Sequence, residues 1–431
     1  MNQPDQPVIS PQAGIPDHKS RTHWPSVLQF VFSTLAVIGL WSIAFISLAL
    51  GLMDGTAALG SADNSLSLLM ISGITLTSGL LVTPSAILSL RRITGRPVTS
   101  YPRYPSWIQP RFLIFVLPVV LLSGYLVITQ TALSWLLLPP LHVLAVLIPI
   151  VWLVYLTVRG LPLGSPQRSW GVFDSGLILG PALILLAELL ALAAFVVIAL
   201  VYISSHPDLY NEITALFERL TSVPSTEIVI ELLAPYLTSP WTIFAIFVFA
   251  AIVVPLIEEA LKPIGVWLLA GRNLSPAEGF AAGALSGAGF ALFESMAMTS
   301  GGVDWVVPVV ARISTAVIHI FTTSLMGWAL ASAWSERRYA RLGITYLGVV
   351  LLHGTWNGLT LMMTVSGLFL ELGQGTQAPF LALIGTLAPF LLSLITILVF
   401  VAMLRLNRSF RVASQGETQS KKITQNSPGV S

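Results

Sequence analysis

The stretch AIVVPLIEEALKPIGVWLLA occupies residues 251–270 and places two adjacent glutamates and one lysine inside an apolar run. Such a run is long enough to cross a bilayer, because a membrane-spanning helix needs about 20 predominantly apolar residues. Ionisable side chains at the bilayer centre cost roughly 2.5 to 3.5 kcal/mol each on insertion scales, so they persist there mainly when they are paired or functional. The stretch therefore predicts a membrane helix that carries part of a buried polar site.

Three further polar signals follow in the next apolar runs. They are Phe290 with Glu294, Arg312 with His319, and His353 with Asn357. Residues four or seven apart share one face of a helix, so each of the last two pairs projects from a single face. We expect several membrane helices to converge on one cluster of these side chains.

The composition is that of an integral membrane protein. Of the 431 residues, 55% are hydrophobic and 9% are charged, whereas a soluble domain carries about 25% charged residues. The absence of cysteine excludes disulfides, a cysteine nucleophile and thiolate metal sites, so any metal ion would need histidine and carboxylate ligands. A net charge of +2 gives no reason to expect a nucleic acid partner.

The hydropathy pattern predicts an all-α, multi-pass protein of the cell membrane with about ten transmembrane helices. The apolar runs cover about residues 27–52, 66–90, 112–131, 137–158, 175–203, 241–270, 277–301, 306–333, 342–367 and 378–404. With both termini placed in the cytoplasm, Arg219 is the only basic residue in an outer loop. This distribution satisfies the positive-inside rule and supports the topology.

This topology divides the chain into six segments. We expect a disordered cytoplasmic tail at 1–25, a five-helix membrane region at 26–203, an extracytoplasmic loop at 204–239, a membrane core with the polar cluster at 240–367, a last transmembrane helix at 378–404, and a basic, disordered cytoplasmic tail at 405–431. We favour a core with a five-helix attachment over a single bundle. The sequence leaves the oligomeric state open.

The outer loop has an amphipathic pattern of its own. Apolar residues recur there at helical spacing, at Leu209, Ile213, Leu216, Phe217 and Leu220. The pattern predicts a helix on the outer membrane surface. It could cover the polar cluster or guide a substrate to it, or it could simply lie at the interface.

Spacing suggests partners for some of the ionisable residues. Glu258 and Lys262 are four apart and can neutralise one another, whereas Glu259 is rotated by about 100 degrees and needs another partner. Arg312 has Glu294 or Asp304 as a counter-ion in a structural salt bridge. Glu188 stands alone in the fifth apolar run and could reach the site or a gate.

The glycines before Glu294 indicate tight helix packing. Gly279, Gly283 and Gly287 form a repeated G-x-x-x-G pattern, which permits close approach of two helix backbones. Glu294 lies seven residues after Gly287, on nearly the same face. We therefore expect this interface to lead to a carboxylate that lines the site.

The four signals together resemble the PrsW family of intramembrane proteases, which is similar in turn to the CAAX-protease and bacteriocin-processing group. The resemblance rests on Glu-Glu-x-x-Lys, Phe-x-x-x-Glu, Arg before His, and His-x-x-x-Asn, and it covers about residues 240–365. It implies that the core at 240–367 is a membrane-embedded peptidase whose substrate is a membrane-anchored regulator, such as an anti-sigma factor. Carried over by position, it points to Glu258, Glu259, Glu294, His319, His353 and Asn357 as catalytic residues.

The chain departs from the CAAX group at two places. Lys262 follows the glutamate pair after two residues, where that group has Arg after three, and Glu294 stands where that group has His. The resemblance therefore favours a PrsW-like role over the processing of prenylated proteins.

Two hydrolytic chemistries fit these residues. In the first, Glu258 or Glu259 activates a water molecule, His319 or Glu294 positions it, and His353 with Asn357 stabilises the oxyanion. In the second, a Zn²⁺ ion lowers the pKa of the water, with metal-ligand candidates Glu259, Glu294, His319 and His353. Lys262 and Arg312 have structural or electrostatic roles in both, and the sequence leaves the choice open.

Two other classes of function compete with the peptidase. A proton-coupled transporter also needs intramembrane Glu and His, but it predicts repeats with interrupted helices in both halves, and the polar residues here lie in the second half. A non-catalytic membrane scaffold of the same fold predicts that the glutamates can be replaced without loss of function.

Overall fold

The computed structural model describes residues 23–56, 62–101, 110–130, 134–223, 225–297, 305–372 and 379–426. The described residues contain helices and no β-strand, which confirms the predicted all-α fold. The expected N-terminal tail lies outside the described residues through residue 22, and so does Asp304.

The first half of the chain forms antiparallel helices and two irregular helical turns. These are α1 (Trp24–Thr56), α2 (Ala62–Ile93), the 3-10 helix η1 (Pro110–Val116), α3 (Leu117–Gln130), α4 (Ser134–Val158), α5 (Pro166–Asp174), the π-helical turn η2 (Ser175–Leu179) and α6 (Gly180–Ser204). Because α5, η2 and α6 are continuous, one long span runs through residues 166–204.

The second half contains the elements expected to carry the site. These are α7 (Pro207–Thr221), α8 (Thr226–Leu237), α9 (Pro240–Val248), the π-helical turn η3 (Phe249–Val253), α10 (Val254–Leu261), α11 (Ile264–Trp267), α12 (Pro276–Ala297), α13 (Val306–Glu336), α14 (Tyr339–Glu371) and α15 (Pro379–Asn426).

Nine helical segments among the described residues are long and apolar enough to cross a membrane, and they correspond to nine of the ten predicted runs. The tenth run, 342–367, is the 33-residue helix α14. It is long enough to span, but polar residues such as His353 and Asn357 lower its mean hydropathy, so it is not among the nine. The multi-pass membrane fold is confirmed, and the side on which the termini lie stays a prediction.

The centre of the molecule is α12, which is enclosed on most of its surface. In its apolar window, 78% of the residues are buried, compared with 17% in α1. A Cβ atom at Gly283 would lie 2.2 Å from the backbone oxygen of Thr323 on α13. On another side, a Cβ at Gly176 in η2 would lie 2.1 Å from the backbone oxygen of Ser286 on α12. Only glycine allows these helix backbones to approach so closely.

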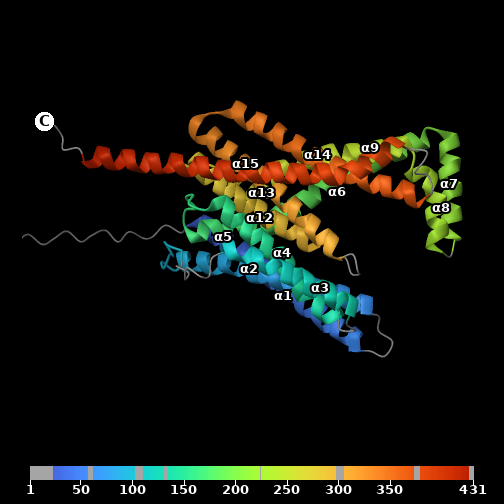
Figure 1. The fold of residues 1–431 in the computed structure, drawn as a ribbon, viewed down its shortest axis with the longest axis horizontal. Coiled ribbons are helices and arrows are strands. Elements are labelled where there is room, and N and C mark those ends of the chain that lie inside the picture. The colour runs from blue at the N-terminus through green and yellow to red at the C-terminus, as the bar shows by residue number, and fades with distance from the viewer. Residues whose placement is uncertain are drawn as a thin grey trace, which may run out of the picture.

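The two halves share one hydrophobic core. A single cluster of buried residues includes Val143 of α4, Leu177 of η2, Ala288 of α12, Ile318 of α13 and Met403 of α15. In Figure 1, α12 and α13 lie between α1–α4 on one side and α14 and α15 on the other. The small residues of α12 let the N-terminal helices pack directly against the helices of the core, and the division into a core and a five-helix attachment stays a prediction.

The outer loop is helical, as its pattern predicts. The predicted amphipathic segment is α7, and a second helix, α8, follows it; Tyr236 of α8 donates a hydrogen bond to Glu212 of α7. The pair lies at one end of the molecule (Figure 1). No residue of α7 is buried, and Phe217 on its apolar face is 68% exposed. The structure therefore does not show α7 covering the polar cluster.

The C-terminal tail differs from expectation. The sequence predicts disorder over 405–431, but α15 remains helical as far as Asn426. Its polar residues include Gln, Lys and Arg, which have good helix propensity, and no proline follows Pro389 within the helix. The tail therefore extends the last membrane helix beyond the bundle (Figure 1).

Candidate functional site

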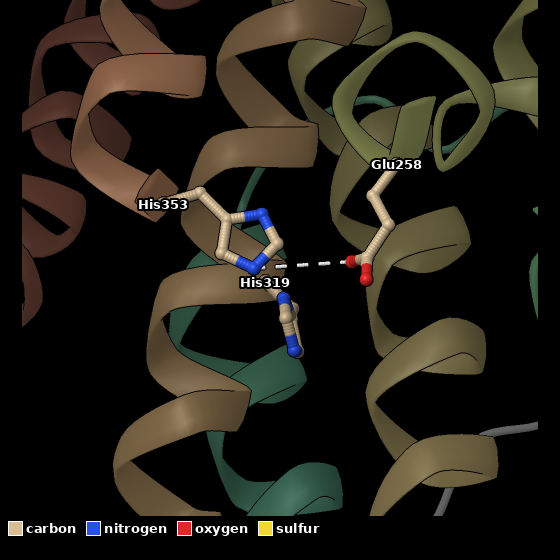
Figure 2. Close-up of side chains that lie close together, drawn as sticks. All are labelled: Glu258, His319 and His353. Atoms are coloured by element: carbon tan, nitrogen blue, oxygen red, sulfur yellow. Dashed lines mark ion pairs between the residues drawn. The ribbon is translucent and has the colours of Figure 1, made fainter. Parts of the chain in front are cut away.

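The polar residues of three helices meet in one buried cluster. Glu258 and Glu259 come from α10, Lys262 follows its end, His319 lies on α13 and His353 on α14. Each of the five is at most 9% exposed. Figure 2 shows the Glu258 carboxylate and the two imidazoles pointing toward one another from three separate helices.

Lys262 is the centre of this cluster. Its Nζ atom lies 2.7 Å from Glu258 Oε2 and 2.8 Å from Glu259 Oε1. The same Nζ is 2.9 Å from His319 Nδ1 and 3.3 Å from His353 Nδ1. The predicted pairing of Glu258 with Lys262 is therefore present, and the charge of the fully buried lysine is compensated by two carboxylates and by the Nδ1 lone pair of His319.

Glu259 has different contacts from those expected. The spacing predicted a partner other than Lys262, yet Glu259 shares that ammonium with Glu258 and gains His353 as well, with 2.9 Å between Oε1 and Nδ1. The long lysine side chain reaches both carboxylates across the helix surface. We assign a proton to His353 Nδ1 from this contact, which leaves Nε2 facing Glu258 Oε2 at 3.9 Å.

His319 connects the lysine to a second charged pair. Its Nε2 lies 2.6 Å from Glu294 Oε2, and Arg312 Nη2 lies 2.7 Å from the same carboxylate. The structure thus brings Glu294 and His319 to one level of the membrane, and Glu294 is the counter-ion of Arg312. A proton on Nε2 of His319 leaves Nδ1 to accept from Lys262.

Phe290, the first residue of the Phe-x-x-x-Glu signal, contacts the cluster with its ring. The Lys262 Nζ atom lies 4.8 Å from the ring centroid, and the His319 ring meets the Phe290 ring edge to face at 5.1 Å. A cation over an aromatic face is stabilised by the ring quadrupole. The phenylalanine therefore closes one side of the cluster without adding a polar group.

The π-helical turn η3 explains how α14 approaches α10. A Cβ atom at Gly354 would lie 2.3 Å from the Ala251 oxygen, so α14 packs against η3 through glycine. Asn357 Nδ2 donates a hydrogen bond to Ala250 O, also in η3, at 3.0 Å. Among the described contacts Asn357 has none with the charged cluster. It lies one helical turn beyond His353 and holds α14 against the turn that precedes the glutamates.

Glu188 lies closer to the charged cluster than the sequence alone indicated. It lies on α6, which packs against α10, and its carboxyl group interacts with that of Glu258. Its Oε1 atom is buried with no hydrogen-bond partner in the described part of the chain. The only sequence signal for its role was an isolated glutamate in an apolar helix. Placing such a residue inside the membrane costs free energy, so it persists there mainly when it has a function.

Three of these side chains form a set that could hold a metal ion. One ligand atom from each of Glu258, His319 and His353 lies within 4.8 Å of the others. The set includes Glu258, which was not among the expected ligands, while Glu259 and Glu294 stand behind the two histidines. Carboxylate contacts to the outer nitrogen of a histidine orient the ring and favour metal binding at the other nitrogen. The donor chemistry therefore fits zinc, provided that Lys262 Nζ withdraws from His319 Nδ1.

Comparison with known proteins identifies the region around this cluster. Residues 181–384 match the model of the PrsW family, described as intramembrane metalloproteases. No curated protein and no solved structure matches the chain. The matched region begins at the start of α6, so it includes Glu188 as well as the four signals. Over residues 181–384 this chain, an integral membrane protein, is similar to the PrsW family of intramembrane metalloproteases.

Proposed function

We propose that this protein is a metal-dependent intramembrane peptidase that hydrolyses a peptide bond of a membrane-anchored protein. The observation that carries the proposal is the convergence of Glu258, His319 and His353 within 4.8 Å, in a buried cluster inside the matched region. Such a donor set, with one open position, is typical of catalytic zinc sites.

In this proposal Glu258, His319 and His353 hold the ion. A bound zinc ion supplies a water molecule of lowered pKa and polarises a carbonyl group. Glu294 holds His319 at Nε2, and Glu259 holds His353 at Nδ1, so each imidazole presents its remaining nitrogen to the cluster. These two carboxylates are positioning residues rather than ligands.

The charges of the cluster support a divalent ion. Glu188, Glu258, Glu259 and Glu294 offer four carboxylates, whereas Lys262 and Arg312 provide two cations. If all are ionised, two negative charges remain, which one divalent metal ion would neutralise. Unneutralised charge in a low-dielectric interior is strongly unfavourable, so a charge balance of this kind favours occupation of the site.

Glu188 is the proton acceptor in this proposal. It lies beside Glu258, and no ion pair of the described residues engages it. A carboxylate that has no direct ion pair can take a proton from a water held near Glu258 and return it to the leaving amine. Asn357, whose carboxamide is bonded to Ala250 O, positions α14 and is not assigned to the oxyanion.

The substrate is a protein with a membrane anchor, of the anti-sigma-factor-like class, cleaved in the plane of the cell membrane. The cluster lies among spanning helices, so the scissile bond has to enter the bilayer region. Glu258 and Glu294 are its more accessible members, with side chains 11% and 36% exposed, so the substrate approaches from their side.

The test is cleavage of candidate membrane-anchored regulators in liposomes, with metal analysis of the same preparations. Glu258→Gln, His319→Ala and His353→Ala should abolish cleavage and lower the bound zinc, and a chelator should abolish cleavage by the wild type. Glu218→Gln, an exposed glutamate on α7, is the matched control and should behave as wild type.

Three outcomes would be informative in different ways. Cleavage that disappears in Glu258→Gln while no preparation contains metal would establish the glutamate-only chemistry. Cleavage that persists in well-folded Glu258→Gln and His353→Ala would contradict the catalytic proposal. Absence of cleavage by the wild type as well as by the variants would favour a non-catalytic scaffold of this fold.

A further inference from the structure

The bundle contains a groove whose lining includes no side chain of the charged cluster. It has a volume of about 640 Å³ and lies between α1, the end of α2, α5 with η2, and α11. Its wall is apolar and includes Leu28, Phe32, Leu35, Leu179 and Leu268. Several of these side chains are largely exposed, with Leu35 at 64% and Leu268 at 59%.

The mouth of this groove is basic. Arg92, Arg168, Arg272 and His23 line it. Arg168 is paired with Glu278 at 2.8 Å, but Arg92 and Arg272 have no acidic partner in any ion pair of the described residues. Two exposed guanidinium groups beside a spanning apolar wall form an uncompensated positive site.

The environment of His23 shows that this positive charge is concentrated. Burial lowers the pKa of His23, and the nearby guanidinium groups of Arg92 and Arg272 lower it further. The one acidic group of the groove, Asp174, is 1% exposed and accepts a hydrogen bond from Ser33. The net field at the mouth is therefore positive.

We propose that this basic groove binds an anionic glycerophospholipid from the leaflet on the predicted cytoplasmic side. The lipid phosphate lies between Arg92 and Arg272, and one acyl chain follows the apolar wall along Phe32, Leu35 and Leu268. Charge complementarity selects the headgroup, since basic pockets between membrane helices on this side attract anionic lipids. The apolar wall selects a lipid over a soluble phosphate.

The groove shares a wall with the charged cluster. Gly265 and Leu268 line it, and the Gly265 N–H lies 3.4 Å from Ser286 Oγ, which donates to the Lys262 carbonyl at 2.6 Å. A bound lipid therefore supports the short helix α11, directly after Lys262. This site does not depend on the peptidase proposal, because it is defined by residues outside the cluster.

The test uses the full-length protein in detergent, equilibrated with equal amounts of phosphatidylglycerol and phosphatidylcholine with identical acyl chains, and measures retained lipid by native mass spectrometry. The wild type should retain phosphatidylglycerol preferentially. Each basic residue contributes roughly fivefold in affinity for an anionic lipid, so Arg92→Gln with Arg272→Gln should lower this preference about 25-fold.

Two further variants separate the parts of the proposal. Arg405→Gln with Arg408→Gln removes the same charge from exposed positions on α15 and should leave the preference unchanged. Leu35→Trp narrows the groove without changing charge and should lower the number of retained phosphatidylglycerol molecules. Both changes are at exposed positions, so folding should be preserved.

Three results would overturn the inference. Equal loss of preference in the two double variants would mean that only the general basic surface attracts anionic lipid. Complete displacement of the lipid by an equal concentration of glycerol phosphate would mean that the groove recognises the phosphate alone and that the acyl chain contributes nothing to binding. An unchanged preference in the Arg92 and Arg272 double variant would also refute it.

Discussion

At the scale of single residues, Lys262 connects almost everything in the cluster. Two carboxylates and two imidazoles lie within 3.3 Å of one ammonium group that is fully buried. A buried charge network adds little net stability when it is complete, but removing one member leaves uncompensated charges. Of the residues in the cluster, we therefore expect replacement of this lysine to lower the free energy of unfolding the most.

Lys262→Met tests this directly. Methionine has nearly the same length, but it leaves Glu258 and Glu259 buried without a cation, which should cost about 3–5 kcal/mol of unfolding free energy. The expected result is a clearly lower unfolding temperature in the same detergent. Arg219→Met on the exposed surface of α7 should change it little. If both variants unfold at the same temperature, the ammonium is not what balances the glutamates.

Glu188→Gln separates proton transfer from metal binding. Because Glu188 is proposed to move a proton and not to hold the ion, kcat should fall about 100-fold or more while zinc content and KM stay near wild type. The measurement is cleavage kinetics in liposomes, with Glu231→Gln, an exposed glutamate on α8, as the matched control. A kcat within twofold of the wild type would remove Glu188 from the reaction.

The sequence identifies the ionisable members of the cluster because their presence in apolar runs is costly. It cannot show which partner each one has. Glu259 lies at an angle that argued against Lys262, yet the long lysine side chain reaches it. Glu188 was understated because the packing of α6 against α10 is a tertiary contact with no local signal in either helix.

At the scale of elements, the turn η3 and the helix α14 set the position of His353. A π-helical turn inserts an extra residue and shifts the register of everything after it. No residue type marks such a turn, so the bond from Asn357 to Ala250 could not be anticipated, although the shared face of His353 and Asn357 could. The glycines of α12 were informative, because G-x-x-x-G spacing encodes close packing directly.

Gly354→Ala should disturb the site through the backbone. The added methyl group would lie 2.3 Å from the Ala251 oxygen, so α14 has to move away from η3 and carry His353 with it. Zinc affinity should fall at least about tenfold, since metal sites depend closely on ligand orientation. The measurement is a zinc titration in detergent.

Gly348→Ala, on the same helix, is the control for this change. A Cβ there meets nothing within 4 Å, and alanine favours a helix by about 1 kcal/mol over glycine, so zinc affinity should be unchanged. Equal zinc affinity in the two variants would show that the contact with η3 does not position the histidine.

At the scale of the whole molecule, the family region and the folding unit do not coincide. The match covers residues 181–384, whereas α12 packs against α4, α5 and η2 from before it. Trp305, at the start of α13, donates a hydrogen bond to His142 of α4 at 3.2 Å. The N-terminal helices are therefore part of the support for the site.

Removal of residues 1–165 tests whether the two halves can be separated. The truncated chain would expose the face of α12 that now meets α4, so we expect a large loss of folded, monodisperse protein after detergent extraction. Removal of residues 1–22 should leave the yield and the unfolding temperature unchanged. A truncated chain that unfolds at the wild-type temperature would support the interpretation of a separable attachment.

The polar character of α14 also has a consequence for biogenesis. This helix carries His353 and Asn357 and is not among the segments apolar enough to span a membrane on their own. A translocon that partitions each segment by its own hydrophobicity would retain α14 poorly. We expect that the contacts of His353 with Glu259 and of Asn357 with Ala250 favour its insertion once the preceding helices are in place. The residues of the candidate site would then couple the integration of α14 to that of the helices before it.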